Sequence, residues 1–302
     1  MNTNINFAGI KMKNPVTVAS GTFGYGREFS QFFDLSKLGG IITKGTSLKP
    51  KSGNKPPRVC ETAGGMLNSI GLQNPGVEYF AQKDLPFLKK FDTAIIVNAC
   101  GNSLEDYVEL CKILNKLDIN GVELNLSCPN VKAGCMAFGS SYEGVKKVTS
   151  KVRKVLDKPL IVKLTPNVTD IVSIAKGAEE AGADGISLIN TLLGMKIDIN
   201  KRKPVLANNT GGLSGPAIKP IAVRMVYQVA QAIHIPILGM GGITNGVDAI
   251  EFILAGATAI SIGAGNFINP YTSINTIKEI ESYMKKNEIR NINDIIGKVE
   301  MN

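Results

Sequence analysis

Eight short, almost continuously apolar runs recur along the chain, and most of them end in Gly, Asn, Lys or Thr. They occupy residues 15–21, 39–45, 94–100, 121–127, 159–165, 185–191, 236–242 and 259–265. Such continuous apolar content is typical of strands in a parallel sheet that is covered on the outside. The chain is therefore expected to fold around a buried parallel sheet.

Helix-like segments separate most of these runs, at residues 103–117, 141–157, 169–182, 217–233, 245–256 and 273–285. Ser103, Ser141 and the pair Thr169-Asp170 stand where a helix N-cap is expected. Eight strands alternating with helices over 302 residues predict an α/β fold, a (β/α)8 TIM barrel that forms a single domain over residues 1–302. A doubly wound sheet of similar length is the alternative.

Segments outside this alternation predict additions to the barrel. The opening NINFAGIKMKNP is expected to form a short hairpin before the first strand, at the bottom of the barrel. Two connections, from Thr46 to about Thr93 and from Leu192 to Pro216, are too long for simple barrel loops. Long loops at the C-terminal rim of a barrel usually serve as lids or substrate loops.

Charge and composition exclude several classes of function. The formal charge is +9, but 28 Lys against 6 Arg are scattered without a basic block, which argues against nucleic-acid binding. The single histidine, His234, precedes the seventh strand on the stability face of a barrel, so His-rich metal sites are disfavoured and no metal is expected.

The same composition predicts a cytoplasmic location. Five cysteines without a CxxC pair fit a reducing compartment. The N-terminal residues lack the apolar core of a signal peptide, and no run reaches the length that spans a membrane.

The C-terminal ends of the eight strands are expected to hold the active site, as in other TIM barrels. In order they are Ser20-Gly21, Lys44-Gly45, Asn98, Asn125 with Cys128 nearby, Lys163, Asn190-Thr191, Gly241-Gly242 and Gly263. This set lacks the paired carboxylates of glycosidases and the ligands of hard cations or zinc. Its amides and lysines suit a planar, polar, anionic ligand. The glycine-rich ends of strands seven and eight suit a phosphate.

Seven motifs together resemble the dihydroorotate dehydrogenase family. They are SGTFG (20–24), NSIGLQNPG (68–76), ELNLSCPNVKAG (123–134), VKLTPNVTD (162–170), INT (189–191), GGLSGPAIKP (211–220) and GMGGI (239–243). The similarity extends from near residue 5 to about residue 270. It implies a barrel with one FMN per chain that oxidises dihydroorotate to orotate in pyrimidine biosynthesis.

The resemblance also implies a subclass. Cys128 stands where the membrane-bound, quinone-using class has a serine, and the segments 128–139 and 211–220 are similar to the NAD-using soluble class. That class pairs its catalytic subunit with an iron–sulfur flavoprotein carrying FAD and a [2Fe–2S] cluster. This chain has no cysteine array and no GxGxxG, so those groups are expected on a partner subunit, around a homodimer core within a heterotetramer. The fumarate-linked class of the same enzyme remains an alternative.

Carried over residue by residue, the resemblance implies that Cys128 is the general base that takes a proton from dihydroorotate while a hydride passes to FMN. The implied substrate residues are Lys44, Asn68, Ser69, Ile70, Gly71, Leu72, Asn125, Asn190 and Thr191. The implied FMN contacts are Ser20, Lys44, Gly45, Asn98, Asn125, Lys163, Ile189, Gly215, Gly241, Gly242, Gly263 and Ala264. Lys163 would stabilise negative charge on the reduced flavin.

Two further functions remain open on the sequence. A flavin barrel that reduces free pyrimidines, as in dihydropyrimidine dehydrogenase, shares the NLSCPN-type loop, although the NSIGLQNPG loop and the compact length favour dihydroorotate. A degenerate barrel that acts only as a scaffold is the non-enzymatic alternative, and the intact set of lysines, asparagines and cysteine argues against it.

Overall fold

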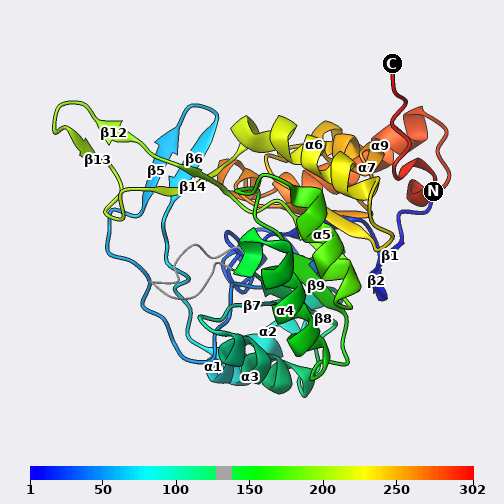
Figure 1. The fold of residues 1–302 in the computed structure, drawn as a ribbon. Coiled ribbons are helices and arrows are strands. Elements are labelled where there is room, and N and C mark those ends of the chain that lie inside the picture. The colour runs from blue at the N-terminus through cyan, green and yellow to red at the C-terminus, as the bar shows by residue number, and fades with distance from the viewer. Residues whose placement is uncertain (127–137) are drawn as a thin grey trace.

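The computed structural model of this chain describes residues 1–126 and 138–302, and its centre is a closed barrel of eight parallel strands (Figure 1). In chain order these are β3 (Val16–Val18), β4 (Gly40–Ile42), β7 (Ala94–Ala99), β8 (Gly121–Asn125), β9 (Leu160–Lys163), β10 (Gly185–Leu188), β15 (Ile237–Met240) and β16 (Ala259–Ile262). Each predicted apolar run contains one of these strands. The (β/α)8 barrel is confirmed, and the doubly wound alternative is wrong.

Five of the six predicted helical segments contain one α-helix each, the sixth (273–285) lies within α9, and these helices lie around the barrel (Figure 1). They are α3 (Leu104–Asn115), α4 (Tyr142–Arg153), α5 (Ile171–Glu180), α6 (Lys219–Ala230), α7 (Gly246–Leu254) and α9 (Thr272–Lys286), with the short α1 (Val77–Tyr79), α2 (Leu85–Leu88) and α8 (Gly265–Ile268). The predicted caps form, because Ser103 Oγ accepts from the Asp106 N–H at 3.1 Å and Ser141 Oγ accepts from the Gly144 N–H at 3.1 Å.

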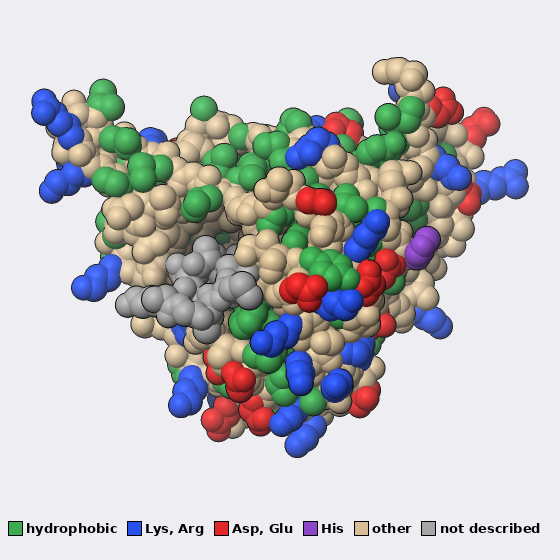
Figure 2. Space-filling view, viewed as in Figure 1, with side chains coloured by type: hydrophobic (Ala, Val, Ile, Leu, Met, Phe, Trp, Pro, Cys, Tyr) green, Lys and Arg blue, Asp and Glu red, His purple; other side chains and the backbone are tan. Residues whose placement is uncertain are grey.

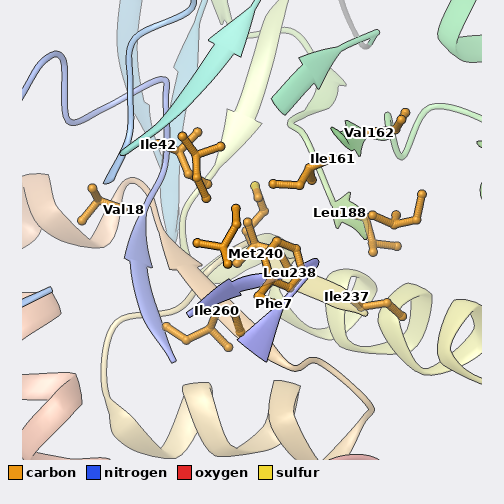
Figure 3. Close-up of a cluster of buried hydrophobic side chains, with 14 of the residues drawn as sticks. Phe7, Val18, Ile42, Ile161, Val162, Leu188, Ile237, Leu238, Met240 and Ile260 are labelled. Carbon is orange, nitrogen blue, oxygen red and sulfur yellow. The ribbon is translucent and has the colours of Figure 1, made fainter. Parts of the chain in front are cut away.

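The predicted N-terminal hairpin closes the bottom of the barrel. β1 (Ile5–Phe7) pairs with β2 (Ile10–Met12) in antiparallel register. Phe7 is fully buried, and its ring tip would lie 3.2 Å from a Cβ placed on Gly185, the first residue of β10. Figure 3 shows Phe7 in one cluster with Leu238 and Ile260 of the barrel strands. The hairpin therefore completes the core at the end opposite the strand C-termini.

We expect Phe7→Ala to lower the free energy of unfolding by about 3–5 kcal/mol, because it removes a buried ring and leaves a cavity. Urea denaturation followed by circular dichroism measures this change. Lys11→Ala, on the exposed face of the same hairpin, is the control and should change stability by less than about 0.5 kcal/mol. Equal small effects of both substitutions would contradict a core role for the hairpin.

The two long connections pair with each other rather than remaining separate loops. β5 (Val59–Thr62) and β6 (Gly65–Asn68) come from the first, and β11 (Leu192–Gly194) and β14 (Gly211–Ser214) come from the second. They form a four-stranded antiparallel sheet in the order β11-β14-β6-β5, here called the rim sheet. The short β12 (Ile197–Asp198) and β13 (Lys203–Pro204) extend from it as a projecting hairpin (Figure 1).

The surface bears out the location predicted for the histidine. Figure 2 shows Lys and Arg side chains dispersed over one face, and the histidine lies at the surface. His234 is exposed just before β15, and its backbone N–H donates to Glu179 Oε1 at 2.6 Å.

Of the helices in the described ranges, none has both the length and the apolar character needed to cross a membrane.

Candidate active site

A cavity of about 550 Å³ lies at the C-terminal ends of the barrel strands and extends along the rim sheet. Each of the eight strands contributes a residue within one position of its end or just beyond it, from Ser20 after β3 to Gly263 after β16. The volume falls in the range of sites that hold small molecules or cofactors. Its location is the one at which TIM barrels carry out their chemistry.

The cavity brings together all the predicted substrate and flavin residues that the structure describes. They are Ser20, Lys44, Gly45, Asn68, Ser69, Ile70, Gly71, Leu72, Asn98, Asn125, Lys163, Ile189, Asn190, Thr191, Gly215, Gly241, Gly242, Gly263 and Ala264. Cys128 lies outside the described residues. Residues far apart in the sequence therefore share one cavity, and their individual roles stay predictions.

Lys44 and Lys163 are the only charged side chains among the described residues that line the cavity. Lys163 is 4% exposed, and Lys44 is partly buried. Burial lowers the pKa of Lys44, because removal from water penalises the ammonium form; the nearby Cys100 partly opposes this shift, and Arg58 adds to it. A cavity with two lysines and no carboxylate on its described lining favours an anionic ligand.

The register of four neighbouring strands assembles a polar network beneath the cavity. Asn98 of β7 lies opposite Glu123 of β8, and Lys163 of β9 lies opposite both Asn125 of β8 and Ser187 of β10. Side chains two residues apart on a strand share a face, so Glu123 and Asn125 point to the same side of the barrel wall. Glu123 is not among the site residues predicted from the sequence. Its signal was a lone carboxylate within the apolar run 121–127.

Glu123 is fully buried, and within the described ranges its carboxylate lies beside an amide, a hydroxyl and an ammonium group, all of them donors. Its Oε2 accepts from Asn98 Nδ2 at 2.5 Å and lies 3.7 Å from Lys163 Nζ, while its Oε1 accepts from Ser187 Oγ at 2.7 Å. Lys163 Nζ in turn lies 3.5 Å from Ser20 Oγ. The carboxylate thus connects two residues of the cavity wall without lining the cavity itself.

The amide of Asn98 links this network to the cavity. Its Oδ1 accepts from Asn125 Nδ2 at 3.3 Å and from Cys100 Sγ at 3.2 Å. A Cβ on the neighbouring Gly45 would lie 2.8 Å from Cys100 Sγ, so a side chain at this position would displace the thiol. The buried Cys100 therefore packs beneath the cavity floor in a polar network.

Two consecutive glycines after β15 present bare backbone to the cavity. Gly241 and Gly242 have φ values of +127° and +81°, which side chains with a Cβ rarely adopt. A Cβ on Gly242 would also lie 2.8 Å from Lys219 Cβ. This cradle without side chains lets a flat ring or a phosphate approach the main chain closely.

The rim sheet positions the predicted substrate loop, residues 68–72, at the cavity. Asn68 Nδ2 donates to Gly212 O at 3.4 Å, and the Ser69 N–H donates to Arg58 O at 2.8 Å. Ser69 Oγ is buried without a hydrogen-bond partner in the described part of the chain. A bound polar ligand would satisfy this hydroxyl, as buried polar groups require. The cavity thus offers bare backbone, neutral amides, hydroxyls and two ammonium groups. This set of groups fits a flavin beside a small anionic substrate.

Comparison with known proteins gives one consistent family. The family model described as "Dihydroorotate dehydrogenase" matches residues 2–284. A protein of Lachnoclostridium phytofermentans is 58% identical over 300 residues, which cover 99% of this chain and 100% of that protein. Proteins of Alkaliphilus metalliredigens (58%; 98% of each chain) and Geotalea uraniireducens (54%; 97% of this chain and 96% of that protein) are also similar. All three are named "Dihydroorotate dehydrogenase B (NAD(+)), catalytic subunit".

Proposed function

The chain belongs to the dihydroorotate dehydrogenase family, and from that premise we propose that it is the catalytic subunit of an NAD-linked enzyme that oxidises dihydroorotate to orotate in pyrimidine biosynthesis. The observation that carries the proposal is the cavity whose described lining has Lys44 and Lys163 as its only charged groups. Dihydroorotate is a small ring of amides with one carboxylate, so it matches this set of amides and cations.

The family is a flavin family, and FMN is the flavin proposed for this chain, with one per barrel. When bound, it supplies a group that accepts a hydride. Gly241 and Gly242 are proposed to receive its phosphate, Asn98 and Ser20 to bind its ring system, and Lys163 to offset negative charge that develops on the ring. The other proposed contacts are Lys44, Gly45, Asn125, Ile189, Gly215, Gly263 and Ala264.

The substrate would lie between this flavin site and the rim sheet. Lys44 is proposed to pair with the carboxylate, Asn125, Asn190 and Thr191 to hold the ring amides, and residues 68–72 to close the substrate side. Cys128 is proposed to remove the ring proton as a thiolate. A thiol can serve as a base near neutral pH when cationic neighbours lower its pKa.

Transfer of electrons to NAD is proposed to need a second protein. Electrons are proposed to leave for NAD through a partner subunit that carries FAD and a [2Fe–2S] cluster, in a heterotetramer around a homodimer of this chain. The relatives' name "catalytic subunit" supports a separate partner. We also propose that the whole chain is one FMN-binding domain, since barrel strands span Val16 to Ile262 in chain order, and that it works in the cytoplasm.

Anaerobic titration of the flavin-loaded chain tests the proposed reaction. Dihydroorotate should bleach the flavin absorbance at one equivalent, whereas reduced flavin should not be reoxidised by uracil. NAD reduction should appear only when the partner subunit is added. Bleaching reversed by uracil would favour the dihydropyrimidine reaction, and reoxidation by fumarate without a partner would favour the fumarate-linked class.

We expect Lys44→Met to raise KM for dihydroorotate by about 10- to 100-fold, since a hydrogen bond to a charged group contributes about 1.5–3 kcal/mol. Burial lowers the pKa of Lys44, so its ammonium loses its proton at a lower pH than that of an exposed lysine. Wild-type KM should therefore rise on the alkaline side as pH passes this pKa, and KM of Lys44→Met should lack this rise. Lys49→Met, an exposed lysine outside the cavity, is the matched control. If KM of Lys44→Met still rises on the alkaline side as in the wild type, the rise belongs to another titrating group.

A further inference from the structure

Glu123 is a buried carboxylate that no proposed catalytic step uses. It is 0% exposed and lies two residues before Asn125 on β8, behind the lining of the cavity. Asn98 of β7, Lys163 of β9 and Ser187 of β10 all contact its carboxylate. Burying a charge costs free energy unless it is paired and hydrogen-bonded. Both oxygens of Glu123 have hydrogen-bond donors, and a lysine ammonium lies at 3.7 Å. The sequence thus retains an ionic group where an apolar side chain would fill the barrel.

The carboxylate also determines which way the neighbouring amides face. An ionised carboxylate only accepts hydrogen bonds, so the NH2 group of Asn98 must point toward Glu123. That leaves Asn98 Oδ1 facing Asn125, whose NH2 group donates to it at 3.3 Å. One buried charge therefore sets the amide orientation of two residues that line the cavity.

The same charge acts on Lys163. Glu123 Oε2 is the acidic group within 4 Å of Lys163 Nζ in the described structure. A nearby carboxylate offsets part of the positive charge that the lysine offers to the cavity, and the offset is large in a buried site where water screens little. Glu123 and Lys163 together therefore determine how strongly this side of the cavity stabilises added negative charge.

We propose that Glu123 is a positioning residue that aligns the cavity face of Asn98, Asn125 and Lys163 and limits how strongly Lys163 favours the reduced flavin. The proposal rests on the proposed flavin-dependent function. It predicts that loss of the carboxylate charge makes the bound flavin easier to reduce, while loss of the hydrogen-bonding order weakens substrate binding. A carboxylate with only a structural role would alter stability and leave the flavin equilibrium unchanged.

The experiment is an equilibrium redox titration of the bound flavin against a reference dye, without dihydroorotate or a partner. Glu123→Gln should raise the equilibrium constant for two-electron reduction about tenfold, which is about 30 mV for such a couple. A separate steady-state assay of Glu123→Gln should give a higher KM for dihydroorotate, because glutamine can donate as well as accept and no longer fixes the Asn98 amide. Glu109→Gln, on the exposed face of α3, is the charge control and should leave the potential unchanged.

Ser187→Ala gives a second arm that preserves the carboxylate. It removes the hydroxyl that donates to Glu123 Oε1, so the negative charge is less compensated and the flavin should become slightly harder to reduce, opposite to Glu123→Gln. If Glu123→Gln does not fold, the flavin potential of Ser187→Ala tests the proposal. A lower potential than that of the wild type supports it, and an unchanged or higher potential contradicts it. Wild-type potentials in both variants would overturn the inference about Glu123. Failure of the wild-type chain to bind flavin would instead overturn the proposed function.

Discussion

Cys128→Ala is expected to lower the rate of flavin reduction by dihydroorotate by about 100- to 10,000-fold, the usual contribution of a positioned general base. The substitution removes the thiolate that would accept the ring proton and leaves the lysines and amides of the cavity in place. Flavin content and dihydroorotate affinity should therefore stay close to wild type. Stopped-flow measurement of flavin bleaching at saturating dihydroorotate isolates this step from transfer to the partner.

Two further variants separate base catalysis from a general effect of losing a thiol. Cys128→Ser keeps a proton acceptor but is a much weaker acid, so it should react faster than Cys128→Ala and only at higher pH. Cys60→Ala removes a partly exposed thiol of β5 that does not line the cavity, and it should reduce flavin at the wild-type rate. A wild-type rate in Cys128→Ala at neutral pH would show that another group is the base.

The barrel could be predicted from the sequence because its signals are local. Each strand is a short apolar run, and Ser103 and Ser141 mark helix starts within a few residues of the pattern they cap. The topology of a TIM barrel then places every strand end on one face. This is why residues as distant in the chain as Ser20 and Gly263 could be expected from the sequence to share a site.

The rim sheet and Glu123 could not be predicted, because both depend on pairing between distant segments. β6 and β14 align Asn68 with Gly212, and neither segment has a strong strand pattern of its own. In the sequence, Glu123 is a single charged residue in an apolar run. Its partners Asn98 and Ser187 come from other strands and are identified only by the strand register. Register depends on the closed barrel as a whole, and propensity carries no information about it.

Lys163→Met is expected to give the second large effect, a loss of flavin retention together with lower stability. It removes the cation proposed to stand beside the flavin and leaves Glu123 as an uncompensated buried charge. Removing one partner of a buried ion pair typically costs about 3–5 kcal/mol of folding free energy. Flavin content after desalting and urea denaturation of the apoprotein measure the two effects separately. The exposed Lys147→Met on α4 is the control and should change neither.

The double variant Lys163→Met with Glu123→Gln distinguishes a flavin contact from a purely structural lysine. Removing both charges eliminates the unpaired carboxylate, so stability should return toward wild type by more than the single effects would sum to. Flavin retention should not return with it, because the cation at the cavity wall is still missing. Recovery of both properties in the double variant would mean that Lys163 serves only to neutralise Glu123. Recovery of stability alone would support Lys163 as the group that offsets charge on the flavin, with its strength set by the carboxylate behind it.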